Sequence, residues 1–149
     1  MRYTAKPHVR WDDIDAFGHI NNAKYLTYVQ EARVEMLWRA RTDAGLEPIL
    51  SDMVVAHAEV DYLLPIYEGA FNIDCIIWVG RIGGASFDMF YELRSAAGLH
   101  AKIKTVQVGV DVVTKKSRRL SDEEHAYLLQ YQELDEPSVD EPSVDEPSA

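Results

Sequence analysis

The chain of 149 residues contains a single cysteine, Cys75. One cysteine excludes an internal disulfide and a cysteine-based metal cluster, and it favours a reducing compartment. Long apolar runs are also missing, because no stretch approaches the roughly 20 residues needed to span a bilayer. The first seven residues, Met1 to Pro7, lack the apolar segment of a secretory signal. We therefore expect a cytoplasmic protein that does not enter a membrane.

Basic residues are scarce: 15 lysines and arginines stand against 25 acidic residues, and the net charge is −10. Much of this excess lies in residues 135–149, which repeat Asp-Glu-Pro-Ser and contain no base. The acidic balance argues against nucleic-acid binding. The acidic, proline-rich composition of residues 135–149 predicts a disordered tail, with solubilisation or partner binding as open roles. Residues 1–134 are the length of one domain.

Residues 22–44 are predicted to form one long helix, because apolar side chains recur at helical spacing. Asn21 or Asn22 suits the N-cap position. Gly45 suits the C′ position, and Pro48 prevents the helix from resuming. Such a helix is roughly 34 Å long and crosses a small domain.

Other segments change to a period of two, which is typical of strands. The predicted strands span residues 3–11, 53–63, 71–79, 85–94 and 106–112, and a capping box at Ser121 and Glu124 predicts a short helix over residues 122–133. The last strand alternates most strictly. Short turns join the later strands, so neighbours are antiparallel. The order predicts an α+β fold, in which an antiparallel sheet wraps around one central helix.

The second face of this sheet has no second layer to cover it. Trp78, Phe90, Leu63 and Val55 lie on the minority face of their strands. Their apolar character predicts that this face is partly buried, and self-association would bury it.

The densest group of polar residues joins the first strand to the long helix and reads Trp11-Asp12-Asp13-Ile14-Asp15-Ala16-Phe17-Gly18-His19-Ile20-Asn21-Asn22. We call it the corner. Strand-to-helix corners place side chains beside the free N–H groups of a helix start. A carboxylate and an N–H donor are what acyl transfer requires, as nucleophile or base and as partner of the developing oxyanion.

The stretch from Val9 to Leu26 resembles the signature of hotdog-fold acyl-CoA thioesterases, the 4-hydroxybenzoyl-CoA thioesterase-like family. The shared pattern is Asp-x-Asp-x-x-Gly-His-hydrophobic-Asn-Asn followed by Tyr. The resemblance implies a hotdog fold, a homodimer or homotetramer, and active sites at the dimer interface. It also implies hydrolysis of acyl-CoA substrates with no metal or cofactor beyond the CoA that the substrate carries.

By the same resemblance, Asp15 is the catalytic carboxylate and the N–H of Asn22, matched through Gly18, polarises the thioester carbonyl. Asp15 as nucleophile and Asp15 as general base both stay open. We interpret Asp13 as structural support, and His19 as either a general acid or a hydrogen-bonded neighbour. Metal binding by Asp13, Asp15 and His19 is disfavoured, because no further ligand cluster accompanies them.

Further candidates lie outside the corner. Glu31 on the predicted helix is a second candidate carboxylate, with a solvated glutamate as the alternative. Ser86 matches a position that contacts the CoA portion in the family, although Gly83, Gly84 and Ala85 stand where some relatives have basic residues. Lys115 and Arg118 belong to the densest basic run and suit phosphates, with a solvated loop as the equal alternative.

Tyr25 is a candidate for lining the acyl pocket, with plain core packing as the alternative. Two other functions also fit the sequence: a non-catalytic acyl-CoA-binding module, and a thioesterase that acts on acyl carrier protein. Assays of thiol release from the same acyl group on both carriers distinguish these functions.

Overall fold

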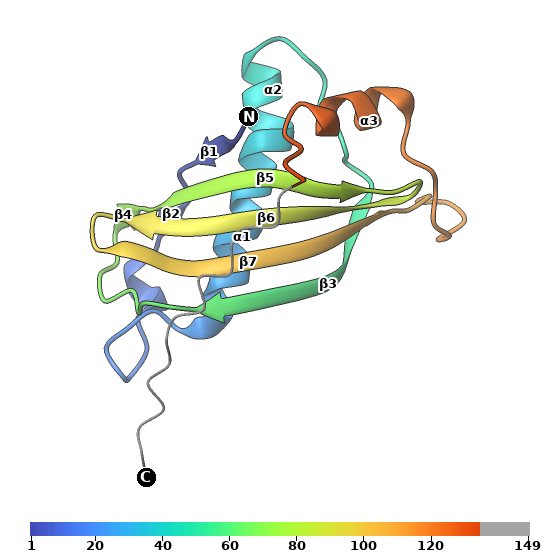
Figure 1. The fold of residues 1–149 in the computed structure, drawn as a ribbon. Helices are drawn as coiled ribbons and strands as arrows, with labels where there is room; N and C mark the ends of the chain where they lie inside the picture. Colours follow the sequence, from blue (N-terminus) through green and yellow to red (C-terminus); the bar gives the residue numbers. More distant parts are fainter. Residues whose placement is uncertain (135–149) are drawn as a thin grey trace.

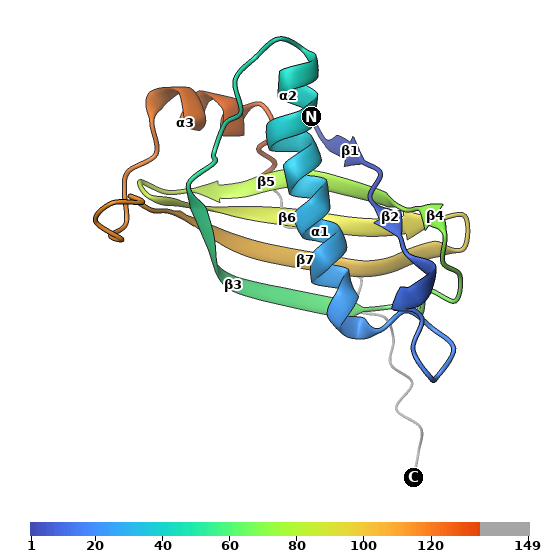
Figure 2. The same ribbon diagram turned by 180° about the vertical axis from the view of Figure 1, so that it is seen from behind.

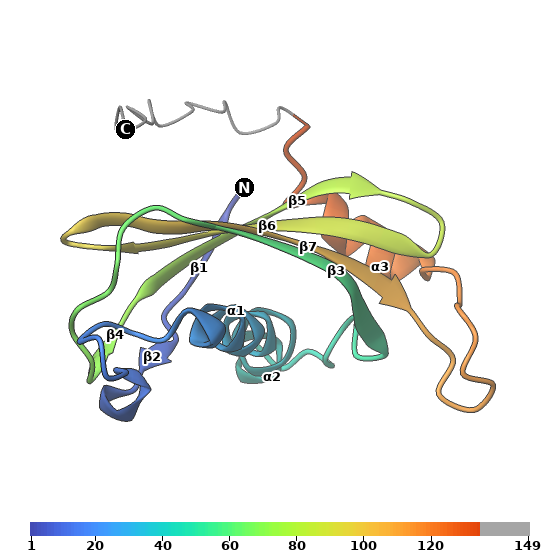
Figure 3. The ribbon, with the colours of Figure 1, turned by 90° about the horizontal axis from the view of Figure 1, so that it is seen from below.

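The computed structural model describes residues 1–134, so the predicted tail lies outside the described residues. A five-stranded antiparallel sheet, in the order β1-β5-β6-β7-β3, curves over the long helix (Figures 1 and 3). Its strands are β1 (Tyr3–Ala5), β3 (Met53–Tyr62), β5 (Asp74–Ile82), β6 (Ser86–Ser95) and β7 (Gly98–Gly109), and β2 (His8–Val9) pairs separately with β4 (Phe71–Asn72). The hotdog arrangement expected from the sequence is confirmed.

The long helix is continuous but not uniform. A 3-10 turn (Asn22–Lys24) leads into α1 (Tyr25–Val34), a π-helical segment (Glu35–Arg39) and α2 (Ala40–Asp43). The side chain of Asn21 accepts a hydrogen bond from the Ala23 N–H at 2.9 Å, which is the predicted N-cap. At the other end Gly45 has a φ of +77°, which glycine adopts without strain. The predicted bounds are confirmed, whereas the π-helical segment was not anticipated.

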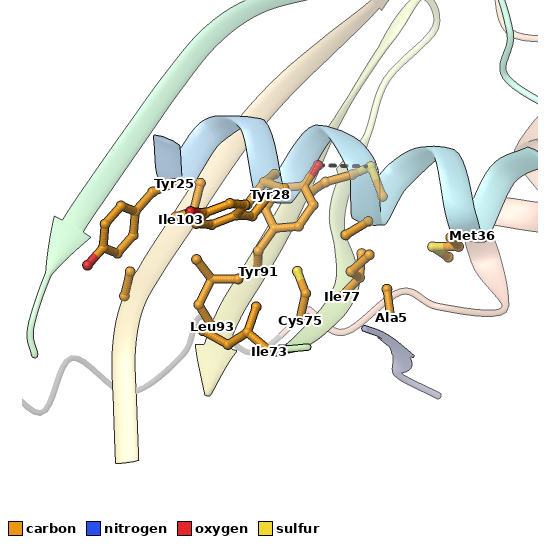
Figure 4. Packing of buried hydrophobic residues seen from close by; sticks show 14 of the residues in the cluster. Ala5, Tyr25, Tyr28, Met36, Ile73, Cys75, Ile77, Tyr91, Leu93 and Ile103 are labelled. Carbon is orange, nitrogen blue, oxygen red and sulfur yellow. Dashed lines mark hydrogen bonds between the residues drawn. The ribbon is translucent and has the colours of Figure 1, made fainter. Parts of the chain in front are cut away.

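The core lies between the helix and the inner face of the sheet (Figure 4). Tyr25, Tyr28 and Met36 project from the helix onto side chains of β5, β6 and β7. The predicted same-face residues are all buried: Ile73, Cys75, Ile77 and Val79 around β5, and Phe87, Met89, Tyr91 and Leu93 on β6. Each large apolar side chain buried in this way stabilises the fold by about 1.5–3 kcal/mol.

Four predicted elements have wrong boundaries. The strand predicted over residues 71–79 is divided at Ile73 into β4 and β5, and β5 continues to Ile82. The first strand, residues 3–11, is broken at Lys6 and Pro7 into β1 and β2, because proline cannot donate to a ladder. The last strand, residues 106–112, instead spans Gly98–Gly109. Its inner face carries Thr105 and Gln107, so the alternating valines point outward. The C-terminal helix α3 ends at Leu129 rather than at residue 133.

The outer face of the sheet is partly covered by the chain itself. Trp78 is buried, stacks on Phe90 with ring centres 5.8 Å apart, and lies under the guanidinium of Arg2. Beyond the end of β1, backbone hydrogen bonds join Val79 to Tyr131 and Glu133, so the C-terminal segment lies along the edge of β5. The predicted partial burial of this face therefore holds for Trp78 without a second copy. The prediction was wrong for Val55, which pairs with the inward-facing Gln107 and lines a groove beside the helix, because the register of β3 shifts between Val55 and His57.

Among the residues that the structure describes, the opposite edge strand of the sheet, β3, pairs only with β7. Val54, Val55 and Tyr62 on this strand keep 47%, 46% and 49% of their surface exposed. A ten-residue edge strand with exposed apolar side chains is a template for pairing with another strand.

The C-terminal helix α3 (Asp122–Leu129) begins with the predicted capping box of Ser121 and Glu124. Arg118 donates two hydrogen bonds to the Glu124 carboxylate, at 2.7 and 3.0 Å. Chiefly because of this contact, the pKa of Glu124 is lowered from its ordinary value.

Glu124 should therefore make acid unfolding steeper. A carboxyl group with a lowered folded pKa stabilises the protein above its unfolded pKa, and this contribution is lost as pH falls below about 4. We expect Glu124→Gln to flatten the loss of unfolding free energy below that pH, measured by urea denaturation between pH 3 and 7. Glu123→Gln is the matched control, since Glu123 on the same helix is 79% exposed. Equal pH profiles for both variants would contradict this role.

Candidate active site

The corner forms a tight loop between Ile14 and Ile20, which are bridged as antiparallel residues. The Asp15 N–H donates to the His19 carbonyl, and the Gly18 N–H donates to the Asp15 carbonyl, each at 3.0 Å. Gly18 has a φ of +83°, a conformation that explains a glycine at this turn. Asp15 is half-buried, and its Oδ1 accepts a hydrogen bond from the Phe17 N–H at 2.9 Å. Within residues 1–134, its Oδ2 has no hydrogen-bond partner.

Asp13 lies beneath this loop. Its buried carboxylate accepts a hydrogen bond from the Tyr28 hydroxyl at 2.8 Å and lies 3.8 Å from Lys24 Nζ. Burial and this carboxylate raise the pKa of Tyr28, so the hydroxyl stays a donor. The backbone carbonyl of Asp13 accepts from the Asn21 N–H at 3.0 Å. Asp13 thus connects the corner to the first turns of the helix.

The helix start offers a donor beside the corner. Asn22 opens the first turn, and the described part of the chain supplies no acceptor for its N–H. Its carbonyl accepts from the Tyr62 hydroxyl at 2.9 Å, which fixes the end of β3 beside the helix. Free N–H groups and the helix dipole at such a position stabilise negative charge.

A groove of about 180 Å³ opens at this helix start. It is lined by His19, Ile20, Asn22, Tyr25, Tyr62, Leu63, Leu64 and Pro65. His19 Nδ1 lies 3.3 Å from the Ile20 carbonyl oxygen, and the Tyr25 and Tyr62 rings meet edge to face. The structure therefore brings His19, Asn22 and Tyr25 together, while Asp15 is on the adjoining loop and is not among the lining residues.

The candidates for CoA binding form a second group around the β5–β6 hairpin. Ser86 Oγ accepts a hydrogen bond from Arg81 Nη2 at 3.0 Å. A Cβ on Gly84 would lie 3.6 Å from the guanidinium of Arg119. Arg119 belongs to the basic run that the sequence predicted for phosphates, whereas Arg81 was missed, although pairing across the hairpin would have placed it beside Ser86. Arg118 is engaged by Glu124.

Lys115 lies in the exposed loop that follows β7, where its φ is +62°. Its side chain therefore faces solvent, as in the alternative of a solvated basic loop. Glu31, the second candidate carboxylate, is exposed on α1.

The group at the helix start and the group around the β5–β6 hairpin lie at opposite ends of the sheet (Figures 1 and 2). Ser86 pairs with Val108, which pairs with Val54 near the start of β3. Tyr62, which contacts the helix start, ends the same strand. Eight residues of strand separate Val54 from Tyr62, a span of roughly 26 Å.

Comparison with known proteins identifies the family. Residues 9–132 match the thioesterase-like superfamily. The chain belongs to this superfamily. The match includes the corner and all strands from β3 to β7, so the family and the class of enzyme inferred from the corner are confirmed.

Individual members of the superfamily agree with this assignment. A 1,4-dihydroxy-2-naphthoyl-CoA hydrolase of Nostoc punctiforme is 31% identical over 127 residues, which cover 83% of this chain and 84% of the hydrolase. A Thermus thermophilus thioesterase in complex with coenzyme A and Zn has a TM-score of 0.70 and 26% identity, over 86% of this chain and 92% of that one. A predicted thioesterase of Bacillus stearothermophilus shares the fold with a TM-score of 0.77 and 24% identity. The match covers 91% of the chain described here and all of the Bacillus chain.

Residues 1–134 contain neither a group of metal ligands nor a membrane-spanning helix. In this part of the thioesterase no three His, Cys, Asp or Glu side chains are grouped as a metal site would require. None of its helices combines the length and the apolar character needed to cross a membrane.

Proposed function

We propose that this thioesterase hydrolyses acyl-CoA thioesters, with Asp15 as the essential carboxylate and the Asn22 N–H as the oxyanion donor. The Nostoc relative is named as a hydrolase of a CoA thioester, and the structure of the Thermus relative is a complex with coenzyme A and Zn. The corner supports the assignment of roles, because an unpartnered carboxylate oxygen and an unpartnered helix N–H belong to the same short segment.

The chemistry follows from these groups. The thioester carbonyl oxygen accepts from the Asn22 N–H, which stabilises the negative charge of the tetrahedral intermediate. Asp15 Oδ2 either removes a proton from the attacking water or itself attacks the carbonyl carbon. In the first case the C–S bond breaks, the CoA thiolate takes up the proton that Asp15 holds, and the acyl group keeps the hydroxyl of water. In the second case the C–S bond breaks to leave an acyl–Asp15 anhydride, and water then cleaves the anhydride, which releases the acid, restores Asp15 and supplies the proton of the CoA thiol. The Phe17 N–H holds Oδ1 and so orients the carboxylate.

The proposed assembly follows from the distance between the helix start and the β5–β6 hairpin within one protomer. CoA bound near Ser86 and Arg81 is far from Asp15 of the same chain. If two copies pair antiparallel through β3, the Tyr62 end of one strand lies beside the Met53 end of the other. The corner of one copy then meets the Ser86 end of its neighbour. We therefore propose a homodimer, or a homotetramer of such pairs, as the active form.

Mixing two damaged variants tests this composite site. We expect Asp15→Asn and the double variant Arg81→Ala, Arg119→Ala each to hydrolyse acyl-CoA poorly at low substrate concentration. After refolding an equimolar mixture, half of the dimers are mixed and each has one intact site, so thiol release should recover to about a quarter of the wild-type rate. Each variant refolded alone is the control. No recovery, or a monomer in sedimentation at micromolar concentration, would contradict the composite site.

A further inference from the structure

A second and larger groove, of about 390 Å³, runs between the helix and the first half of β3. We call it the helix–β3 groove. It is lined by Gln30, Arg33, Val34, Leu37, Trp38, Ile49, Leu50, Ser51, Met53, Val55, Phe87 and Gln107. Most of these side chains are apolar, and Arg33 is the only charged residue among them. The groove shares no residue with the one at the helix start.

Arg33 is a half-buried cation without a counter-ion. No carboxylate in residues 1–134 lies within ion-pair distance of its guanidinium. Its only hydrogen bond in this part of the chain is donated by Nη1 to the Tyr91 hydroxyl at 3.2 Å. A guanidinium has five N–H donors, and a partly buried cation is costly unless an anion or strong acceptor pairs with it.

The guanidinium is held in place by a buried polar network. The Tyr91 hydroxyl lies 2.9 Å from Thr105 Oγ1, and Gln107 Nε2 donates to the same Oγ1 at 3.0 Å. Tyr91, Thr105 and Gln107 are all buried. Burial raises the pKa of Tyr91, so its hydroxyl remains neutral beside the arginine. Arg33 is thus oriented by the core rather than free to fold onto the surface.

Fixed cations in apolar grooves select ligands of one kind. Planar guanidinium groups match carboxylate oxygens, and charge-assisted hydrogen bonds are stronger than neutral ones. The apolar walls from Leu37, Ile49 and Phe87 suit a hydrocarbon body. We propose that the helix–β3 groove binds the acyl group of the substrate, and that Arg33 selects acyl groups that end in a carboxylate.

This proposal rests on the proposed function and on its dimer. Arg33 follows Asn22 by eleven residues, or roughly 16 Å along the helix. A short acyl group held at Asn22 does not reach Arg33 of the same chain. Met53 and Val55 place the groove at the start of β3, which antiparallel pairing sets beside the corner of the other copy. The distal end of the acyl group would then meet Arg33 of the neighbouring protomer.

Paired substrates test the selection. The probes are hexanoyl-CoA and adipoyl-CoA, which differ by a terminal carboxylate. We expect Arg33→Gln to lower kcat/KM about 10- to 100-fold for adipoyl-CoA, and less than about threefold for hexanoyl-CoA. Arg33→Lys should recover part of the loss. Arg39→Gln, on the same helix outside the groove, is the matched control. Equal losses for the two substrates would overturn the proposal.

Binding without turnover separates this proposal from hydrolysis itself. Trp38 lines the groove, so its fluorescence should respond when the same two acyl-CoAs bind to the Asp15→Asn variant, and Trp38→Phe should abolish the response. We expect tighter binding of adipoyl-CoA and loss of that preference in Arg33→Gln. If wild type releases no thiol but the preference is present, hydrolysis fails and the groove assignment stands. If Trp38 emission follows protein concentration but no acyl-CoA, the second copy fills the groove and the assignment fails.

Discussion

Replacing Asp15 with asparagine should lower kcat for acyl-CoA hydrolysis by about 10²–10⁴-fold, the usual contribution of a positioned base. The amide keeps the size of the side chain, and its oxygen still accepts from the Phe17 N–H. What it loses is the ability to attack the thioester or to remove a proton from water. A thiol-release assay at saturating substrate measures the loss, and circular dichroism verifies the fold.

Asp12→Asn is the matched control for this experiment. Asp12 is three residues away in the same corner, its side chain is 62% exposed, and its partner is the nearby Arg10. We expect its kcat to stay within about twofold of wild type, because exposed side chains of this kind contribute little. If Asp15→Asn is as active as Asp12→Asn, Asp15 is not the essential carboxylate and Glu31 becomes the next residue to replace.

Replacing Asp13 with alanine should lower the free energy of unfolding by about 1–3 kcal/mol. The change leaves the hydroxyl of Tyr28 buried without an acceptor, since Asp13 is its partner at 2.8 Å. It should also lower kcat, because the corner then loses its side-chain connection to the helix. Urea unfolding followed by fluorescence measures the first effect and thiol release the second.

Two companion variants sharpen this result. Asp13→Asn keeps an acceptor for the Tyr28 hydroxyl and should recover most of the stability. Tyr28→Phe combined with Asp13→Ala removes both partners, so the double variant should be less destabilised than the sum of the two single changes. Strict additivity would show that the hydrogen bond does not couple the two residues.

Local signals in the sequence predicted much of this molecule. The long helix is marked at both ends by its own residues, Asn21 and Gly45, and the capping box of α3 depends on positions three residues apart. The alternating residues of β5 and β6 identified the buried face correctly because apolar residues occupy every position of that face. The corner was found because its motif is contiguous in sequence.

Features that depend on packing were not predicted. The valines near the end of β7 suggested a strand through residue 112. Instead, Thr105 and Gln107 occupy the inner face, where they form a hydrogen-bond network with the Tyr91 hydroxyl. Glu35, the first residue of the π-helical segment, accepts hydrogen bonds from the Tyr3 hydroxyl and the Lys6 N–H, which are distant in the sequence. Arg81 and Arg33 gain their significance from neighbours that only the folded sheet supplies. Such contacts leave no periodic mark in the sequence.

The two edge strands of the sheet differ in length, and this difference limits how many copies can assemble through the sheet. On the β1 side the strand has only three residues, proline follows it closely, and the segment from Tyr131 to Glu133 occupies the remaining border of β5. On the β3 side ten residues are open. In the proposed dimer, pairing through β3 would use the open edge of both copies, so a third copy would find no long strand on which to add. Such pairing would end at two sheets and would prevent open-ended polymerisation through the sheet edge.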